Sequence, residues 1–378
     1  MTRFSGEQLK NGAISVFGAF DFDQRPEGIS PRRLPAWTRP QLPQPVDVMA
    51  RMPSGVRLAF ETDSRRIALA VQTTKLQMPP LPARKPAFDL VVDGRDAGTQ
   101  TSELGNTLVV DMTKPGMFDI VRGEPYTVTF GNLAAGNKRC EIWLPHNAYV
   151  ELRALEIDDG ATLTPTPAPR TKRWIHHGSS ISHCMEANTP TGVWPAVAAR
   201  HAGLHLTSLG FGGQCHLDQF VARTIRDSDA DLVTVKVGIN VINMDSMRER
   251  VFMPALHGFL DTIREGKPTT PIVVISPIFC PSAESTPGPT FPNAAGKFVT
   301  FPGNDALRVG CMSLRRVREI ISEVVATRAK QDPNLRYLNG LELFGEADAG
   351  DLPDDLHPSP EGYARMGERF ARWISTTS

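Results

Sequence analysis

Four pieces of this sequence, far apart along the chain, carry residue types that together could perform acyl transfer through a serine ester. They contain Ser180, Gly213, Asn240 and the pair Asp354 and His357. A serine hydroxyl is a poor nucleophile at neutral pH and needs an adjacent general base, usually a histidine oriented by a carboxylate. The one-turn spacing of Asp354 and His357 lets the carboxylate reach one ring nitrogen while the other faces the serine. These residue types therefore predict a Ser180–His357–Asp354 triad.

The same pieces supply donors for the negative charge that develops on oxygen when a carbonyl is attacked. Preorganised N–H groups at that point are worth about 3–4 kcal/mol each. The candidates are the backbone N–H groups of Ser180 and Gly213 and the side-chain amide of Asn240. A glycine lets the backbone approach a substrate closely. Gly210 and Gly212 compete with Gly213 for this role, and the alternative role for Asn240 is to brace its own turn.

Each piece also has an ordinary structural interpretation. A single Gly-Ser-Ser turn is most often only a turn, and Ser179 and Ser182 are rivals of Ser180 that would otherwise cap the following helix. The alternative for His357 is a loop histidine bonded to backbone, and Asp355 is the rival carboxylate. The catalytic interpretation requires all four pieces to meet in space.

Other residues near these pieces are expected to bind substrate. Ser179, His216 and Glu284 are the candidates. Glu284 lies in a long Pro/Gly/Ser-rich insertion at 279–301, and loops of this length are usually functional or mobile. The insertion is predicted to be either a substrate lid or an interface loop.

No metal or cofactor is expected. Four residues of two loops have zinc-compatible chemistry, but no two of them form a tight ligand pair, so they are expected to line the pocket. They are His183, Cys184, Cys215 and His216. An acyl-CoA would enter only as an acyl-donor substrate.

Composition excludes several classes of protein. The chain has 378 residues, with 41 Lys and Arg against 41 Asp and Glu, so it lacks the basic footprint of a nucleic-acid-binding protein. No apolar run approaches the ~18 residues of a membrane-spanning helix, and the polar N-terminus lacks a secretory apolar region. Five cysteines without CxxC spacing favour a reducing cytoplasm. The expected partners are a small-molecule acyl donor and an alcohol acceptor; the oligomeric state stays open.

The second half of the chain alternates strand and helix patterns. Strands are expected at 174–178, 204–209, 232–238, 272–276 and 335–338, and helices at 194–202, 217–225, 252–263, 312–329 and 360–374. This alternation predicts an α/β domain, a parallel sheet with helices on both faces, over 173–378. Ligands of such sheets bind at the carboxyl ends of the strands, where all four pieces fall.

The first half contains short β-rich runs separated by turn residues. They are expected at 56–60, 67–71, 88–92, 108–110, 126–130, 140–145 and 149–152. This pattern predicts an N-terminal antiparallel β-sandwich over 1–160, a jelly-roll-like module for packing, oligomerisation or carbohydrate binding. The proline-punctuated residues before about 45 are expected to wrap a surface. Three alternating prolines predict a semi-rigid linker at 161–172.

The four pieces, in order, resemble the four sequence blocks of the GDSL, or SGNH, hydrolase family. The resemblance covers most of 174–375 and implies a flavodoxin-like three-layer fold. It implies Ser180 as nucleophile, His357 as base and Asp354 as its orienter, with Gly213 and Asn240 as oxyanion donors. The residues after Gly178 do not form G-x-S-x-G, which disfavours an α/β-hydrolase elbow.

Two positions depart from the family pattern. Ser179 stands where the family name has Asp, and Val241 stands where Asp is common. Both positions line the implied site and indicate an unusual substrate preference.

The whole layout resembles a narrower group of GDSL-type enzymes with an N-terminal β-sandwich, which includes O-acyltransferases that tailor polyketides. Residues 237–241, 144–145 and 276–281 carry this likeness. It is the only ground for predicting O-acyl transfer, from a thioester to a hydroxyl of a natural product, over the alternative of ester hydrolysis. A second alternative, from another class, is a non-catalytic binding protein on an SGNH scaffold.

Overall fold

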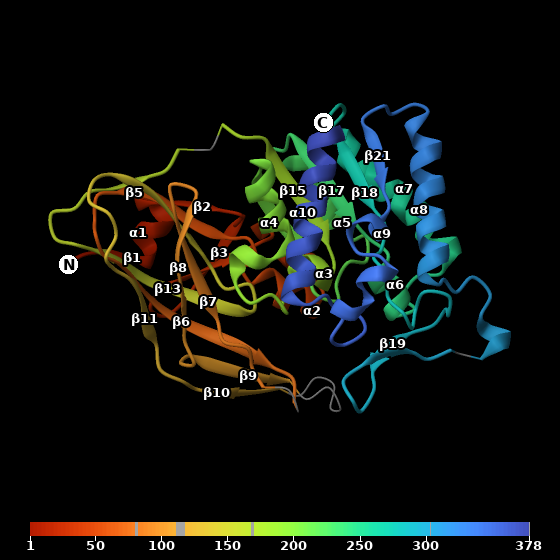
Figure 1. Cartoon of the computed structure of the whole chain (residues 1–378), viewed down its shortest axis with the longest axis horizontal. Helices are drawn as coiled ribbons and strands as arrows, with labels where there is room; N and C mark the ends of the chain where they lie inside the picture. The colour runs from red at the N-terminus through yellow and green to blue at the C-terminus, as the bar shows by residue number, and fades with distance from the viewer. Residues whose placement is uncertain (80–81, 111–117, 168–169, 303, 378) are drawn as a thin grey trace. The chain divides into compact units, whose positions relative to one another are not determined.

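The computed structural model describes the chain except for residues 80–81, 111–117, 168–169, 303 and 378 (Figure 1). Its contacts divide the chain into two compact units. Unit 1 contains residues 1–39, 47–170 and 188–191, and unit 2 contains residues 40–46, 171–187 and 192–378.

Unit 1 contains two β-sheets. The larger has the order β10-β9-β6-β13-β4-β3, with β1 paired to β13 and β11 to β6. Its strands are β1 (Thr2–Ser5), β3 (Asp21–Gln24), β4 (Ile29–Arg32), β6 (Ile67–Gln77), β9 (Asn106–Val110), β10 (Phe118–Val121), β11 (Tyr126–Phe130) and β13 (Ala148–Ile157). Within the described residues its pairings are antiparallel except that of β6 with β9.

The smaller sheet has the order β14-β5-β12-β7-β8, with β2 paired to β5, and its described pairings are antiparallel. Its strands are β2 (Ser15–Phe17), β5 (Arg57–Thr62), β7 (Ala87–Val92), β8 (Arg95–Thr101), β12 (Lys138–Trp143) and β14 (Leu163–Pro165). In the larger sheet, alternate residues of β13 are buried along most of its length, as expected for a strand with one face in the core between two sheets. One hydrophobic core contains residues of both sheets: Phe60, Phe88 and Ile142 of the smaller sheet, and Leu69 and Leu155 of the larger sheet.

The expectation that the proline-punctuated pieces at 31–35 and 40–45 wrap a surface is wrong for the first piece, because residues 31–34 are buried. Leu9 and Ile29 belong to the core of unit 1, and all of β4 is buried. The fully buried Arg33 side chain donates hydrogen bonds to the carbonyl oxygens of Met49 (2.7 Å) and Met52 (2.6 Å). A charged side chain enters an interior when its donors are satisfied in this way, which the local sequence does not reveal.

Part of the segment predicted as a linker, 161–172, instead extends a sheet. Leu163–Pro165 forms β14 and pairs with β5, with Leu163 opposite Thr62. The Thr62 hydroxyl donates to the Thr162 carbonyl (2.7 Å), which anchors the start of this segment. Unit 1 also has short helices, α1 (Gly6–Gln8) and α2 (Gln44–Ala50, which begins within unit 2), and helical turns at Leu9–Ala13 and Ala36–Gln41.

Unit 2 is built on a parallel sheet of the order β16-β15-β17-β18-β21. Its strands are β15 (Arg173–Gly178), β16 (His205–Gly210), β17 (Leu232–Lys236), β18 (Ile272–Ile275) and β21 (Leu335–Leu338). In chain order this is 2-1-3-4-5, the flavodoxin-like arrangement, whose ligands bind where the order reverses, at the carboxyl ends of the first and third strands. The predicted fold class is therefore confirmed, and β15 and β17 define the expected site.

Helices cover both faces of this sheet (Figure 1). They are α3 (Ser180–His183), α4 (Trp194–Ala202), α5 (Gln219–Asp227), α6 (Ile239–Asn243), α7 (Glu249–Gly266), α8 (Leu314–Ala329), α9 (Gly340–Leu343) and α10 (Pro360–Thr377). Along β15, Trp174 stacks on Phe370 of α10 (centroids 5.0 Å apart), whereas His177 stacks on Phe259 of α7 (5.7 Å). Residues 174 and 177 point to opposite faces of a strand, so α10 and α7 lie on opposite sides of the sheet.

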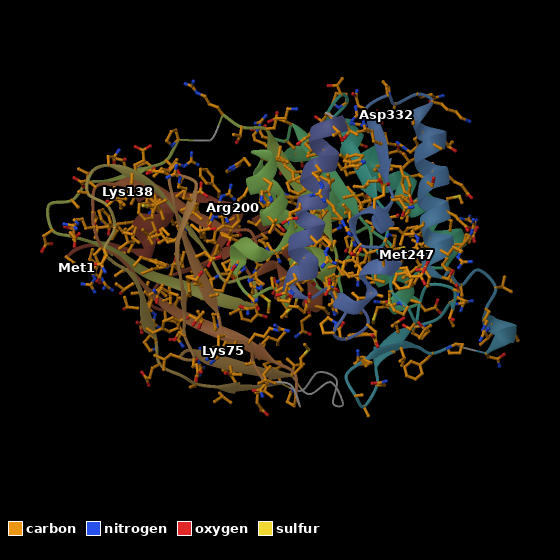
Figure 2. All side chains as sticks on the ribbon, in the orientation of Figure 1. Met1, Lys75, Lys138, Arg200, Met247 and Asp332 are labelled. Carbon is orange, nitrogen blue, oxygen red and sulfur yellow. The ribbon has the colours of Figure 1, made fainter. Side chains whose placement is uncertain are left out.

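Side chains mark the two edges of the sheet in Figure 2. Asp332 precedes β21 at the amino edge, where it accepts a hydrogen bond from Arg264 at the end of α7 (2.6 Å). Met247 lies between α6 and α7, on the side of the carboxyl edge. Among the described helices, none is both long and apolar enough to cross a membrane.

Candidate active site

The turn after β15 presents Ser180 at the carboxyl edge of the sheet. A Cβ added at Gly178 would lie 2.2 Å from the Ser182 hydroxyl, and one at Gly210 would lie 2.6 Å from the Ser182 carbonyl carbon. Both positions therefore require glycine if the chain is to turn this tightly into α3. Ser180 is the first residue of α3 and is half-buried.

The two neighbouring serines have structural roles. The fully buried Ser179 hydroxyl accepts a hydrogen bond from the N–H of Ile181 (3.3 Å) and caps α3. A contact of Ser179 with substrate stays a prediction. Ser182 is also buried and its hydroxyl bonds His176 Nε2 (2.7 Å). Of these three serines, Ser180 is the one whose hydroxyl faces His357, in the loop before α10 that we call the histidine loop.

Ser180, His357 and Asp354 form a continuous chain of hydrogen bonds. Ser180 Oγ lies 2.9 Å from His357 Nε2, and His357 Nδ1 lies 2.7 Å from Asp354 Oδ2. The other oxygen, Asp354 Oδ1, accepts from the backbone N–H groups of Leu356 (2.9 Å) and His357 (2.6 Å). Burial acts to raise the pKa of Asp354, but the hydrogen bonds from His357 and Leu356 outweigh it and lower that pKa. An ionised Asp354 holds the imidazole with Nε2 toward the serine.

Asp355, the rival carboxylate, points elsewhere. It has a positive φ of 65°, and its side chain pairs with Lys297 (3.2 Å). It therefore takes no part in this hydrogen-bonded chain.

Asn240, in α6, and Gly213, in the loop after β16, follow the two strands that flank β15, the strand before Ser180. Asn240, in α6 after β17, accepts a hydrogen bond through Oδ1 from the N–H of Cys215 (3.0 Å). This bond fixes the amide and leaves Nδ2 as its donor end. The loop that contains Gly213 is tied at its start by a bond from the N–H of Phe211 to the carbonyl of Gly178 (2.8 Å). Gly213 has φ +69°, a conformation that favours glycine.

The other two predicted substrate residues are held by protein partners. His216 Nδ1 lies 2.8 Å from the Ser246 hydroxyl, and its Nε2 lies 3.2 Å from the Gly213 carbonyl oxygen. Glu284 pairs with Arg318, a buried side chain of α8, which anchors the insertion to that helix. A substrate contact for either residue stays a prediction.

The insertion also contributes a residue that the sequence analysis missed. It contains the hairpin β19 (Thr290–Pro292) and β20 (Phe298–Thr300). The N–H of Phe298 donates to the Asp354 carbonyl (2.8 Å), and the Phe298 ring meets His357 edge-on with centroids 5.5 Å apart. The hairpin thus covers one side of the imidazole. An aromatic residue within a long insertion beside the site was the available signal.

A second missed residue is Glu186, which follows α3. Its Oε1 lies 3.9 Å from His357 Nδ1, and its Oε2 accepts a hydrogen bond from the Tyr363 hydroxyl (2.8 Å). Nothing in the local sequence distinguishes this glutamate from a surface residue, because its partners lie about 170 positions away along the chain.

Buried titratable groups lie behind the site. Burial lowers the pKa of His177 to about 4 and that of Lys236, at the end of β17, to about 8. Cys215 Sγ lies 3.4 Å from His177 Nε2. Within the described part of the chain, no group of three or more His, Cys, Asp or Glu side chains could hold a metal ion.

Comparisons with known proteins identify similar families and similar structures. Residues 177–365 match the GDSL-like lipase/acylhydrolase family, and residues 14–153 match the SsfX3 N-terminal domain. No curated protein matches the chain. Among solved structures, a salicylyl-acyltransferase, SsfX3, from a tetracycline biosynthetic pathway is 28% identical, with a TM-score of 0.82 over 100% of this chain and 97% of that chain.

Two family-two carbohydrate esterases show the same fold. The enzyme from Clostridium thermocellum, in complex with cellohexaose, is 14% identical with a TM-score of 0.61 over 96% of this chain and 99% of its own. The enzyme from Cellvibrio japonicus is 12% identical with a TM-score of 0.57 over 99% of this chain and 97% of its own. The family match spans half of the chain and includes Ser180, Asp354 and His357. The chain therefore belongs to the GDSL-like lipase/acylhydrolase family and is a serine acyltransferase or esterase.

Proposed function

We propose that this enzyme is an O-acyltransferase that moves an acyl group from a thioester, such as an acyl-CoA, to a hydroxyl of a natural product. The observation that carries its chemistry is the unbroken hydrogen-bonded chain from Asp354 through His357 to Ser180. Transfer is favoured over hydrolysis by the likeness to a salicylyl-acyltransferase over both halves of the chain.

In the acylation step, Ser180 Oγ attacks the carbonyl carbon of the thioester while His357 Nε2 takes its proton. The negative charge that develops on the carbonyl oxygen is stabilised by the N–H groups of Ser180 and Gly213 and by Asn240 Nδ2. When the tetrahedral intermediate collapses, the carbon–sulfur bond breaks and the imidazolium returns its proton to the leaving thiolate. Ser180 then carries the acyl group.

In the deacylation step, the acceptor hydroxyl takes the place of the thiol. His357 Nε2 removes its proton as the oxygen attacks the acyl carbon, and the bond to Ser180 Oγ breaks. The imidazolium then returns the proton to Ser180, which restores the free enzyme. The ionised Asp354 stabilises the imidazolium in both steps. A metal or cofactor has no part in this scheme.

Ester hydrolysis is the alternative, in which water replaces the acceptor alcohol at the same acyl-Ser180. The carbohydrate esterases share the fold, but at their low identity they support no choice of substrate. The non-catalytic alternative is disfavoured because a binding scaffold has no need of an aligned serine, imidazole and carboxylate. The cytoplasm remains the proposed location, and all five cysteines are free thiols.

Intact-protein mass spectrometry with a panel of acyl-CoAs and acyl esters tests the proposal. We expect one acyl group to add at Ser180, an added alcohol to remove it faster than water does, and Ser180→Ala to abolish the addition. Faster removal by water would establish the esterase alternative. No acylation by any donor, together with no labelling of Ser180 by a fluorophosphonate probe, would support the non-catalytic alternative.

A further inference from the structure

A second carboxylate faces the same nitrogen of His357 that Asp354 binds. Asp354 Oδ2 lies 2.7 Å from Nδ1, and Glu186 Oε1 lies 3.9 Å from that atom. The two carboxylates come from different elements, since Asp354 belongs to the histidine loop and Glu186 to the turn after α3. The chain therefore passes from α3, which begins with Ser180, directly to a carboxylate beside His357.

The position of Glu186 is built by the protein. Its Oε2 accepts a hydrogen bond from the Tyr363 hydroxyl (2.8 Å), and the Tyr363 side chain is fully buried in α10. Burial, and then the neighbouring Glu186 carboxylate, raise the pKa of Tyr363 well above its ordinary value, so the phenol remains a donor. The turn itself is closed by a bond from the N–H of Ala187 to the Cys184 carbonyl (3.0 Å). With Oε2 held by the phenol, Oε1 is the oxygen directed at His357.

We propose that Glu186 is a positioning residue that shares with Asp354 the stabilisation of the His357 imidazolium. The inference rests on the proposed function, in which His357 becomes charged in both steps. An opposite charge within about 4–6 Å favours the charged form of a titratable group. The Glu186 side chain is 21% exposed, so solvent screens part of this effect.

Two carboxylates lie beside the His357 ring, whereas two of its other neighbours carry no charge. Ser180 contributes a neutral hydroxyl at Nε2, and Phe298 is an apolar ring against the imidazole. The Tyr363 hydroxyl, also neutral, bonds Glu186. The nearby Lys297 is paired with Asp355.

The proposal predicts a dependence between the two carboxylates. With Asp354 in place, Glu186→Gln should lower kcat/KM only about 3- to 10-fold, because the direct hydrogen bond still orients the ring. In an Asp354→Asn background, the Glu186 carboxylate still lies beside Nδ1. Glu186→Gln should therefore lower kcat/KM by a factor about ten times larger than in the wild type. If the two carboxylates acted independently, Glu186→Gln would lower kcat/KM by the same factor in both backgrounds.

The decisive experiment is an NMR titration of the His357 imidazole, which requires no turnover. Glu186→Gln should lower the pKa of His357 by about 0.5–1 pH unit. Glu186→Asp, which keeps the charge, should restore most of the difference. Glu361→Gln, which removes an exposed carboxylate at the start of α10, should leave it unchanged. The acid limb of the kcat/KM profile should move in the same direction.

An unchanged pKa of His357 in Glu186→Gln would overturn the inference. If Glu186→Gln does not fold, Tyr363→Phe releases Oε2 from its anchor and carries the same comparison; an unchanged titration there would also count against the proposal. A wild type that is acylated but shows no effect of Glu186 refutes this inference alone. A wild type that is never acylated but shows the shift refutes the proposed function alone.

Discussion

Asn240 offers a substitution that separates catalysis from folding. Its Oδ1 accepts the N–H of Cys215 (3.0 Å), and the side chain is 4% exposed. Asn240→Asp keeps an oxygen for this bond and loses only the Nδ2 donor. Asn240→Ala loses both, and it leaves the Cys215 N–H unpaired in a buried place.

The expected magnitudes differ accordingly. Loss of one oxyanion donor costs about 10²–10³ in kcat, or about 3–4 kcal/mol of transition-state stabilisation. Asn240→Asp should lose at least this much at pH 8, because its carboxylate also repels the oxyanion. Asn240→Ala should lose a similar factor and in addition about 1–3 kcal/mol of unfolding free energy for the buried N–H.

The assay pairs hydrolysis of a chromogenic acetyl ester, and the rate of fluorophosphonate labelling, with urea unfolding of each variant. We expect Asn240→Asp to be as inactive as Asn240→Ala but more stable. Activity of Asn240→Asp within about threefold of the wild type would refute an oxyanion role for this amide. Equal loss of stability in both variants would refute the structural role of the bond to Cys215.

Three further predictions follow from buried or covering groups. Burial lowers the pKa of Lys236 from 10.5 to about 8, so between these pH values the unfolded chain binds this proton and the folded chain does not. The free energy of unfolding of the wild type should therefore rise over this range by up to about 3 kcal/mol relative to Lys236→Met. Free energies of unfolding in urea that change in parallel with pH for the two proteins would contradict this. Burial lowers the pKa of His177 from 6.5 to about 4, so near pH 5 the unfolded chain binds this proton and the folded chain does not. The free energy of unfolding should therefore be about 2 kcal/mol lower at pH 5 than at pH 7. An unfolding midpoint that is the same at both pH values would argue against this. Phe298→Ala removes the ring that covers one side of His357. It should raise, about 2- to 5-fold, the share of acyl groups that pass to water instead of an added alcohol. Mass spectrometry measures this partition ratio, and an unchanged ratio would show that the hairpin does not exclude water.

Local patterns were enough to predict the parallel sheet of unit 2 and the β-rich first half of the chain. The alternation of strand and helix patterns predicted the parallel sheet, because the hydrophobic period of each element depends only on neighbouring residues. Ser180, Asn240, Asp354 and His357 were also visible as candidates, by their residue types and by a block order that resembles the GDSL family.

Only the tertiary structure decided which similar side chains share a role. Ser179 and Ser180 are neighbours, yet one caps a helix and the other faces an imidazole 177 residues away. Arg33 is interior because carbonyl oxygens 16 and 19 residues later satisfy it. Glu186 reaches Tyr363 across 177 residues. Such contacts depend on chain segments that only folding brings together, so no local pattern records them.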